Sequence, residues 1–310
     1  MAENVQPNPE QIDHDGLFKE LLHQCFELFL RLFYPQQAAQ LDFSHFTFLE
    51  QERLTDYPTG KHRHVDTLVE ISTLKGKRIW IHIEFQSSRK RRFPLRMFRY
   101  FSQFRLRGDI PIWSIVLYLP GGGGGLGFEP YTETLFGETS LLWRHWSISL
   151  GDLDADVYQA TENPVAYGLA PLMKQSEMSK PRLKVRCLKG IATSNITQTQ
   201  SVLLTCFVET YLPLNQAEQA EFEQLIQKEE VSVMEFITSW ERKGIEKGRT
   251  EEARETLLEQ LREKFDPVPE TTTQRVQAIS SVEELRRLLR QIIHANSLAE
   301  MGLDGTGLAQ

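Results

Sequence analysis

The first 120 residues alternate between the hydrophobic spacing of helices and that of strands. A helix is expected from Asp13 or Asp15, either of which can cap it, to about Arg31. Pro35 cannot continue this helix, because proline lacks the backbone N–H that the next turn needs. The apolar stripe of the expected helix consists of Phe18, Leu21, Leu22, Cys25, Phe29 and Leu32.

Three strand-like runs follow, at about residues 41–50, 63–73 and 77–86, and a Leu-Lys-Gly-Lys turn predicts that the last two form a hairpin. Residues 93–107 return to helical spacing, and 110–120 form a continuous apolar run between prolines, which is typical of a buried strand. The expected helix has Phe93, Met97, Phe101 and Phe104 on one side. The predicted fold class is therefore α/β, with an α-β-β-β-α-β core over residues 13–120 and a mixed sheet flanked by helices.

The rest of the chain predicts a mainly helical C-terminal half. The glycine run at 121–125 lacks a following Lys-Ser/Thr and a helix, so residues 121–130 are expected to be a flexible loop rather than a phosphate loop. Residues 131–239 are expected to be a helical extension of the core. Residues 240–303 are expected to form a charged helix and a small helical module, with a capping box from Ser280 to Glu283 and a stripe at Leu285, Leu288, Leu289 and Ile292. Disordered tails are expected at 1–12 and 304–310.

The charge is unevenly distributed along the chain. A net charge of -7 argues against a protein that coats nucleic acid through overall positive charge. Residues 89–107, however, contain eight Lys or Arg and no acid, whereas residues 216–263 contain thirteen Asp or Glu against seven Lys or Arg. This asymmetry predicts a local anionic partner on one part of the molecule.

Cysteine usage and the N-terminal segment predict a cytoplasmic protein without a membrane span. The three cysteines are far apart and lack CxxC spacing, which argues against a disulfide framework or a thiolate zinc site. Residues 1–16 are polar and acidic, unlike a signal peptide, and no apolar run approaches the ~20 residues that cross a bilayer.

Two of the expected strands each contain a carboxylate among apolar residues. Asp66 and Glu84 both occupy even positions, so they project from one face if the two strands pair as neighbours. Two adjacent carboxylates repel unless a cation lies between them, and hard oxygen ligands suit Mg²⁺ or Mn²⁺. The alternative is an exposed sheet face on which these charges are solvated. His62, His64 and His82 could bind a transition metal, but plain surface histidines are the more common case.

Several motifs in order resemble a known family: "HDGLFKELL", "VDTLVE", "IHIEFQ", "FPLRMFRYFSQF" and "PIWSIVLYLP". Over about residues 13–120 the chain resembles the Rpn family of recombination-promoting nucleases, which are transposase-like and belong to the PD-(D/E)xK superfamily. The segments "ENPVAYGLAPLM" and "ERKGIEKGR" also resemble such proteins, and residues 251–303 resemble a small helical domain of unknown function that is often attached to them.

The resemblance implies a restriction-endonuclease-like core and a Mg²⁺- or Mn²⁺-dependent DNA endonuclease that hydrolyses phosphodiester bonds in recombination or mobile-element movement. By this analogy Asp66 and Glu84 are the metal-binding carboxylates and the carbonyl of Phe85 adds a backbone ligand. Gln86 stands where the superfamily usually has lysine. Glu20 is the best match for an acid on the first helix, with Asp15 as competitor, although helical spacing equally predicts a solvated face for Glu20.

Gln86 changes the expected chemistry. A lysine would offer positive charge beside the attacking water, whereas a glutamine can only orient that water through its amide. The Rpn family itself commonly has this Glu-x-Gln form, so slow cleavage is expected rather than none. The alternative function is a weak or inactive nuclease-fold scaffold that binds DNA or protein, with C-terminal helices that could pair with a partner or with a second copy of the chain.

The basic segment after the strand acids predicts a DNA contact. Helical spacing places Arg96, Arg99, Tyr100 and Gln103 close together, with Arg89 and Arg92 just before them. We expect these side chains to bind the phosphate backbone with weak sequence specificity. The alternative is a solvated basic helix.

Overall fold

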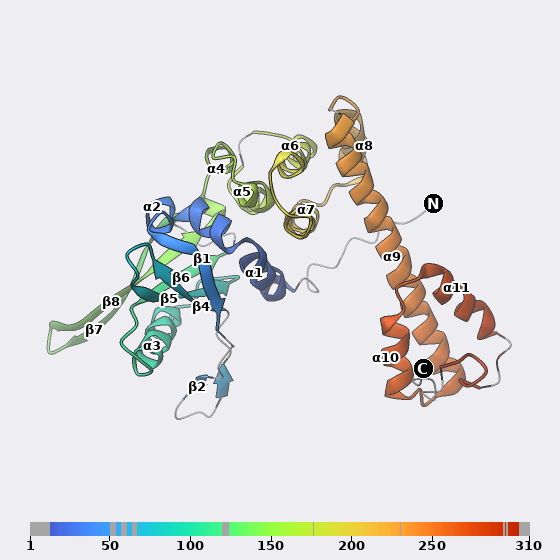
Figure 1. Cartoon of the computed structure of the whole chain (residues 1–310), viewed down its shortest axis with the longest axis horizontal. Helices are drawn as coiled ribbons and strands as arrows, with labels where there is room; N and C mark the ends of the chain where they lie inside the picture. The colour runs from blue at the N-terminus through green and yellow to red at the C-terminus, as the bar shows by residue number, and fades with distance from the viewer. Residues whose placement is uncertain are drawn as a thin grey trace. The chain divides into compact units, whose positions relative to one another are not determined.

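The structure is a computed structural model, and it describes residues 13–49, 54–56, 61–63, 67–119, 124–175, 177–229, 231–293, 295 and 297–303. The chain divides into two compact units, Met1–Glu229 and Glu230–Gln310. The first unit contains a mixed sheet with helices on both faces (Figure 1), which confirms the predicted α/β class.

Six strands form the sheet in the order β1-β4-β5-β6-β8-β7. β1 pairs antiparallel with β4, β4 with β5, and β8 with β7, while β5, β6 and β8 run parallel to one another. Two further short strands, β2 and β3, pair with each other in a separate two-stranded sheet. The strand bounds are β1 Leu41–Phe48, β2 Leu54–Asp56, β3 Lys61–Arg63, β4 Thr67–Thr73, β5 Arg78–Gln86, β6 Ile112–Tyr118, β7 Leu126–Leu135 and β8 Glu138–Ser149.

β4 and β5 form the hairpin that the Leu-Lys-Gly-Lys turn predicted. The turn is closed by the backbone N–H of Thr73, which donates to the carbonyl of Lys77 over 2.8 Å. Gly76 has φ +78°, a left-handed conformation that glycine adopts without steric cost. The register then runs from Ser72 opposite Arg78 to Thr67 opposite Ile83. Trp80 donates its indole N–H to Glu70 over 2.9 Å, so even positions of both strands share one face.

Helix α1 (His14–Phe33) covers the face of the sheet that carries the odd residues of β5. The Asp13 side chain caps it by accepting from the N–H of Gly16, and the whole predicted apolar stripe is buried. The ring of Phe18 lies 5.0 Å from that of Phe85. α1 ends before Pro35, as expected, and after Tyr34 the chain turns into the short helix α2 (Pro35–Ala38), which was not predicted.

Helix α3 (Phe93–Arg105) covers the opposite face, which carries the even residues of β5. Its buried stripe is Phe93, Met97, Tyr100 and Phe104, and these pack with Val116 and Tyr118 of β6. The sequence prediction placed Phe101 in this stripe, but Phe101 is only half-buried, with its ring 5.3 Å from that of Trp143. Tyr100 takes that place because positions 93, 97, 100 and 104 follow the 3.6-residue period more closely.

The structure corrects the prediction for residues 126–149. These residues were assigned partly to a flexible loop and partly to a helical extension, but they form β7 and β8, an antiparallel pair added to the edge of the sheet. Part of this pair continues beyond the rest of the sheet as a two-stranded ribbon (Figure 1). Its turn contains Phe136, a fully exposed residue with φ 53°, and Gly137 with φ 85°.

Helices complete the first unit, as expected for the region after β8. Asn163 and Thr197 cap two of them, and Asn163 also donates its amide to the carbonyl of Leu28 in α1 over 2.8 Å, which ties the helices to α1. Their bounds are α4 Ala155–Gln159, α5 Pro164–Leu169, α6 Lys180–Thr193, α7 Gln198–Tyr211 and α8 Gln216–Ile226, with short 3-10 turns at Leu150–Asp152 and Ala170–Leu172.

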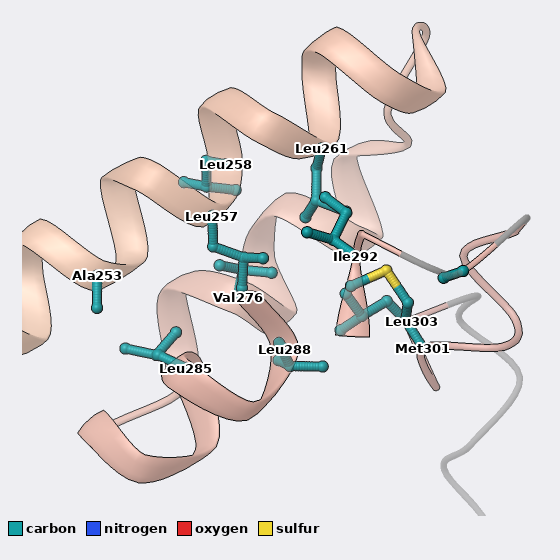
Figure 2. Close-up of a cluster of buried hydrophobic side chains, with 11 residues drawn as sticks. Ala253, Leu257, Leu258, Leu261, Val276, Leu285, Leu288, Ile292, Met301 and Leu303 are labelled. Carbon is teal, nitrogen blue, oxygen red and sulfur yellow. The ribbon is translucent and has the colours of Figure 1, made fainter. Parts of the chain in front are cut away.

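The second unit consists of the long charged helix α9 (Val231–Phe265), α10 (Glu270–Ala278) and α11 (Val282–Gln291). One apolar cluster joins them (Figure 2), and it includes the predicted residues Leu285, Leu288 and Ile292, with Leu289 at its margin. The predicted capping box is displaced by one residue: Ser281, not Ser280, caps α11 and accepts from the N–H of Glu284. Lys264 donates to the carbonyls of Ile292 and Ile293, which stabilises the C-terminal end of α11.

Candidate functional site at the carboxyl ends of three parallel strands

The parallel strands β5, β6 and β8 end side by side. Their last paired residues, Gln86, Tyr118 and Ser149, form one row across the sheet. In α/β sheets the carboxyl ends of parallel strands are the usual place for ligands. The chain after β5 leads into α3, so the predicted acid of β5 and the basic segment meet at this end of the sheet.

Glu84 lies just before this row, under α3. Its side chain is 2% exposed, which contradicts the alternative of a solvated sheet face for this residue. The Nε2–H of His82 donates to Oε1 over 3.1 Å, and Nη2 of Arg96 on α3 donates to Oε2 over 3.2 Å. A carboxylate can be buried only with such compensation, so the guanidinium and the imidazole explain how the sheet tolerates this charge.

Arg96 joins α3 to the sheet through more than this ion pair. Its guanidinium carbon lies 4.4 Å from the centre of the Phe93 ring and 5.9 Å from that of Tyr100. The side chain remains 25% exposed. Arg96 is therefore held by aromatic rings and one carboxylate at the boundary between the interior and solvent.

A second carboxylate, which the sequence reasoning missed, lies half-buried on the same side of the sheet. Glu129 of β7 accepts from the hydroxyl of Tyr118 over 2.6 Å and from Nε2 of His145 over 3.2 Å, and its other oxygen contacts Arg89. Arg89 also donates to Oγ of Ser149 over 2.8 Å and lies 4.3 Å from the centre of the Tyr118 ring. Two carboxylates are thus each bound by one buried histidine and one arginine.

Burial controls ionisation in this second cluster. Desolvation, together with His82 and Arg89, lowers the pKa of His145 from 6.5 to about 4. Because Arg89 already offsets the charge of Glu129, a protonated His145 would add an uncompensated buried cation. Burial also raises the pKa of Tyr118 to about 12, although Arg89 and Arg96 act in the opposite direction.

The α3 face of the sheet also contains polar atoms without a hydrogen-bond partner among the described residues. His82 of β5 lies opposite Ser114 of β6, and His145 lies on the neighbouring strand β8; Nδ1 of both histidines and Oγ of the serine are such atoms. An ordered water is the usual partner for groups of this kind. His82 is therefore an interior residue and not part of a surface histidine group; His64 lies outside the described residues, and of His62 only the backbone, in β3, is described.

The first predicted metal ligand, Asp66, lies outside the described residues. The described register ends one residue later, where Thr67 pairs with Ile83. Glu84 therefore stands one position beyond the last described pair. The pairing of the two strands as antiparallel neighbours, on which the prediction for these acids depends, agrees with the described part of the hairpin.

The structure does not bring Glu20 to Glu84. Glu20 lies on the exposed side of α1 and accepts from the amide of Gln24 over 2.8 Å, as expected for a solvated helix face. α1 packs on the Phe85 side of the sheet, whereas the Glu84 carboxylate points to α3. Asp15 is exposed in the first turn of α1.

The two residues after Glu84 point to opposite sides. The Phe85 side chain is buried against α1, and its carbonyl accepts from the amide of Gln86. Gln86 is half-buried at the end of β5, on the Glu84 side by strand alternation. The Gln86 amide therefore contacts the Phe85 carbonyl, which the family resemblance implies as a backbone ligand of the metal.

The predicted DNA-binding residues fall into two groups. Arg92 and Arg99 are exposed on α3 and just before it. Arg89 and Arg96 are turned towards internal carboxylates, and Tyr100 is 5% exposed with its ring 5.6 Å from that of His82. Gln103 is half-buried. Of these four arginines, Arg92 and Arg99 are exposed, whereas Arg96 and the likewise exposed Arg89 each contact a carboxylate.

The negative charge of Glu84 suits a divalent cation, but the described residues provide fewer ligands than such an ion needs. Glu84 provides hard oxygen ligands, and its buried negative charge needs a nearby cation, which in this structure is the guanidinium of Arg96. Among the described residues, no group of three or more His, Cys, Asp or Glu side chains could hold a metal ion. Arg96 contacts the same carboxylate, so a cation there would compete with a guanidinium.

Comparisons of the chain with protein families, with curated proteins and with solved structures give no match. Within the described part of the chain, the helices include none that is long and apolar enough to span a membrane. The functional interpretation therefore rests on the site itself and on the sequence motifs.

Proposed function

We propose that the chain is a divalent-metal-dependent endonuclease that hydrolyses phosphodiester bonds in DNA with weak sequence specificity. The observation that carries this proposal is a buried carboxylate, Glu84, at the carboxyl ends of parallel strands and directly under a helix rich in arginine. The resemblance to recombination-promoting nucleases assigns the same carboxylate to the metal, and it implies a role in recombination or mobile-element movement.

In this proposal, Glu84, Asp66 and the carbonyl of Phe85 hold Mg²⁺ or Mn²⁺. Such an ion, when bound, supplies Lewis acidity and lowers the pKa of its water. Gln86 orients the attacking water through its amide, and its lack of positive charge predicts slow turnover. Arg92 and Arg99 bind flanking phosphates from the exposed side of α3.

Plasmid cleavage in Mg²⁺ or Mn²⁺ tests the proposal. Glu84→Gln keeps the shape of the side chain and removes its charge, and we expect it to lower the cleavage rate about 100-fold, equivalent to about 3 kcal/mol of transition-state stabilisation. Asp66→Ala is expected to do the same. Glu138→Gln, an exposed carboxylate in β8, is the matched control and should cleave at the wild-type rate. Cleavage that survives Glu84→Gln, or no cleavage with either metal, contradicts the proposal.

Glu20→Gln separates the two interpretations of α1. Glu20 is exposed and hydrogen-bonded to Gln24, so we expect this variant to cleave at the wild-type rate. A loss as large as that of Glu84→Gln would place Glu20 in the active site after all.

A second candidate function is a catalytically inactive nuclease-fold scaffold that binds DNA or protein. The ion pair between Glu84 and Arg96 favours it, because a carboxylate that is satisfied by the protein needs no metal. DNA binding without any uptake of divalent metal would support this candidate over the first. Self-association through the C-terminal helices predicts that light scattering gives a multiple of the chain mass for the full chain but not for a chain ending at Glu229.

A further inference from the structure

Glu84 and Arg96 form a hydrogen-bonded ion pair between the sheet and α3. Both oxygens of Glu84 accept hydrogen bonds, one from His82 over 3.1 Å and one from Arg96 over 3.2 Å, and the carboxylate is 2% exposed. A divalent cation at this carboxylate would be placed beside the positive guanidinium in a weakly solvated site. The two cations repel, so the ion pair opposes metal binding for as long as it remains closed.

Arg96 is placed so that it could contact a phosphate instead. Unlike Glu84 it is one quarter exposed, and it lies on α3 between the exposed residues Arg92 and Arg99. A phosphodiester presents two non-bridging oxygens that share one negative charge, and a guanidinium can bind such a pair as it binds the two oxygens of a carboxylate. The Phe93 ring, 4.4 Å from the guanidinium carbon, supports the side chain without depending on Glu84.

We propose that Arg96 exchanges Glu84 for a phosphodiester group of DNA and that this exchange makes Glu84 available to the divalent cation. The inference rests on the proposed function and adds to it that DNA and metal bind cooperatively. Arg96 is a positioning residue in this scheme, because it acts on the metal through Glu84. Thermodynamic linkage requires the cooperativity to be reciprocal: DNA raises metal affinity by the factor by which metal raises DNA affinity.

The experiment measures Mn²⁺ binding to the full chain from the free-Mn²⁺ electron paramagnetic resonance signal, with and without a short DNA duplex. Mn²⁺ bound by the duplex alone is subtracted. For the wild type we expect DNA to raise Mn²⁺ affinity about 5- to 150-fold, the usual range of such coupling. For Arg96→Gln we expect Mn²⁺ affinity without DNA to be raised by a factor in that range, and DNA to add less than about twofold.

Two matched variants separate the exchange from a general loss of charge. Arg99→Gln removes one positive charge from the same helix, so it should weaken DNA binding but keep the DNA-dependent rise in Mn²⁺ affinity. Glu84→Gln should abolish that rise. The inference is overturned if wild-type Mn²⁺ affinity is the same with and without DNA, or if Arg96→Gln binds Mn²⁺ no more tightly than the wild type.

Arg96→Gln leaves a buried carboxylate without its guanidinium, and a variant that folds only when another cation is present is still informative. In that case, recovery of the helical circular dichroism signal with increasing Mn²⁺ reports the same affinity, and failure to fold at any Mn²⁺ concentration overturns the inference. The two proposals fail separately. DNA-dependent Mn²⁺ binding with intact plasmid supports the exchange but not cleavage, whereas cleavage without this dependence supports the nuclease and overturns the exchange.

Discussion

The buried His145 makes the stability of the first unit depend on pH. Its side chain has no exposed surface, and its pKa is lowered from 6.5 to about 4 in the folded protein. In the unfolded chain the same imidazole titrates near 6.5. Between these two values the unfolded chain therefore binds more protons than the folded one, so the free energy of unfolding must decrease as pH falls.

The magnitude follows from the difference between the two pKa values. His145 contributes its full stabilisation above pH 6.5, loses it progressively as pH falls, and has lost it below about 4. Linkage with these values gives a loss of about 2 kcal/mol between pH 7.5 and pH 5. Other groups titrate in the same range, so the readout is the difference between the wild type and His145→Gln, which keeps an N–H donor for Glu129.

Urea unfolding followed by tryptophan fluorescence measures this difference. Four of the five tryptophans lie in the sheet of the first unit, so the signal reports mainly on that unit: Trp80, Trp113, Trp143 and Trp146. The stability of the wild type relative to His145→Gln should fall by about 2 kcal/mol from pH 7.5 to pH 5. His45→Gln, at an exposed position of β1, is the matched control for losing one histidine. A pH-independent difference for His145→Gln would refute the assignment of a neutral buried imidazole.

Three further outcomes are expected. Phe104→Ala, in the cluster under α3, should cost about 3 to 5 kcal/mol in urea unfolding, whereas Leu106→Ala, at an 87% exposed position, should change stability by no more than about 0.5 kcal/mol; similar costs would contradict the packing of α3. Phe136→Gly should raise stability by about 0.5 to 1 kcal/mol, because φ 53° strains an L-residue more than glycine, and a decrease would contradict this turn geometry. Burial raises the pKa of the Cys25 thiol to about 12, so at pH 8 a disulfide reagent should modify Cys206 long before Cys25, and equal rates would contradict the buried α1 face.

Local pattern was sufficient for most of the core. The helical stripe of α1, the hairpin of β4 and β5 with its glycine turn, and the buried strand β6 all depend on residues that are neighbours in sequence. The same holds for α9 and α11 in the second unit. Hydrophobic periods of 3.6 and 2 residues report which face of such an element is buried, whatever it packs against.

The β7 and β8 pair was missed because its pattern is half-exposed. Several of its apolar side chains face solvent, so the alternation that identifies a half-buried strand is weak. The available signal was the short alternation of Trp146, Ser147 and Ile148 at the end of β8. Missing these strands also meant missing Glu129 and His145, whose partners lie on other strands.

The sequence by itself determined that Glu84 shares a face of β5 with His82 and Gln86, because side chains alternate along any strand. Only the tertiary structure decided that this face is buried, that Arg96 turns inward to Glu84, and that Glu20 lies on the other side of the sheet. The physical reason is that strand alternation is a property of the local backbone, whereas burial and ion pairing depend on which helix packs on which face. That choice is made by the whole core and not by the residues of the site.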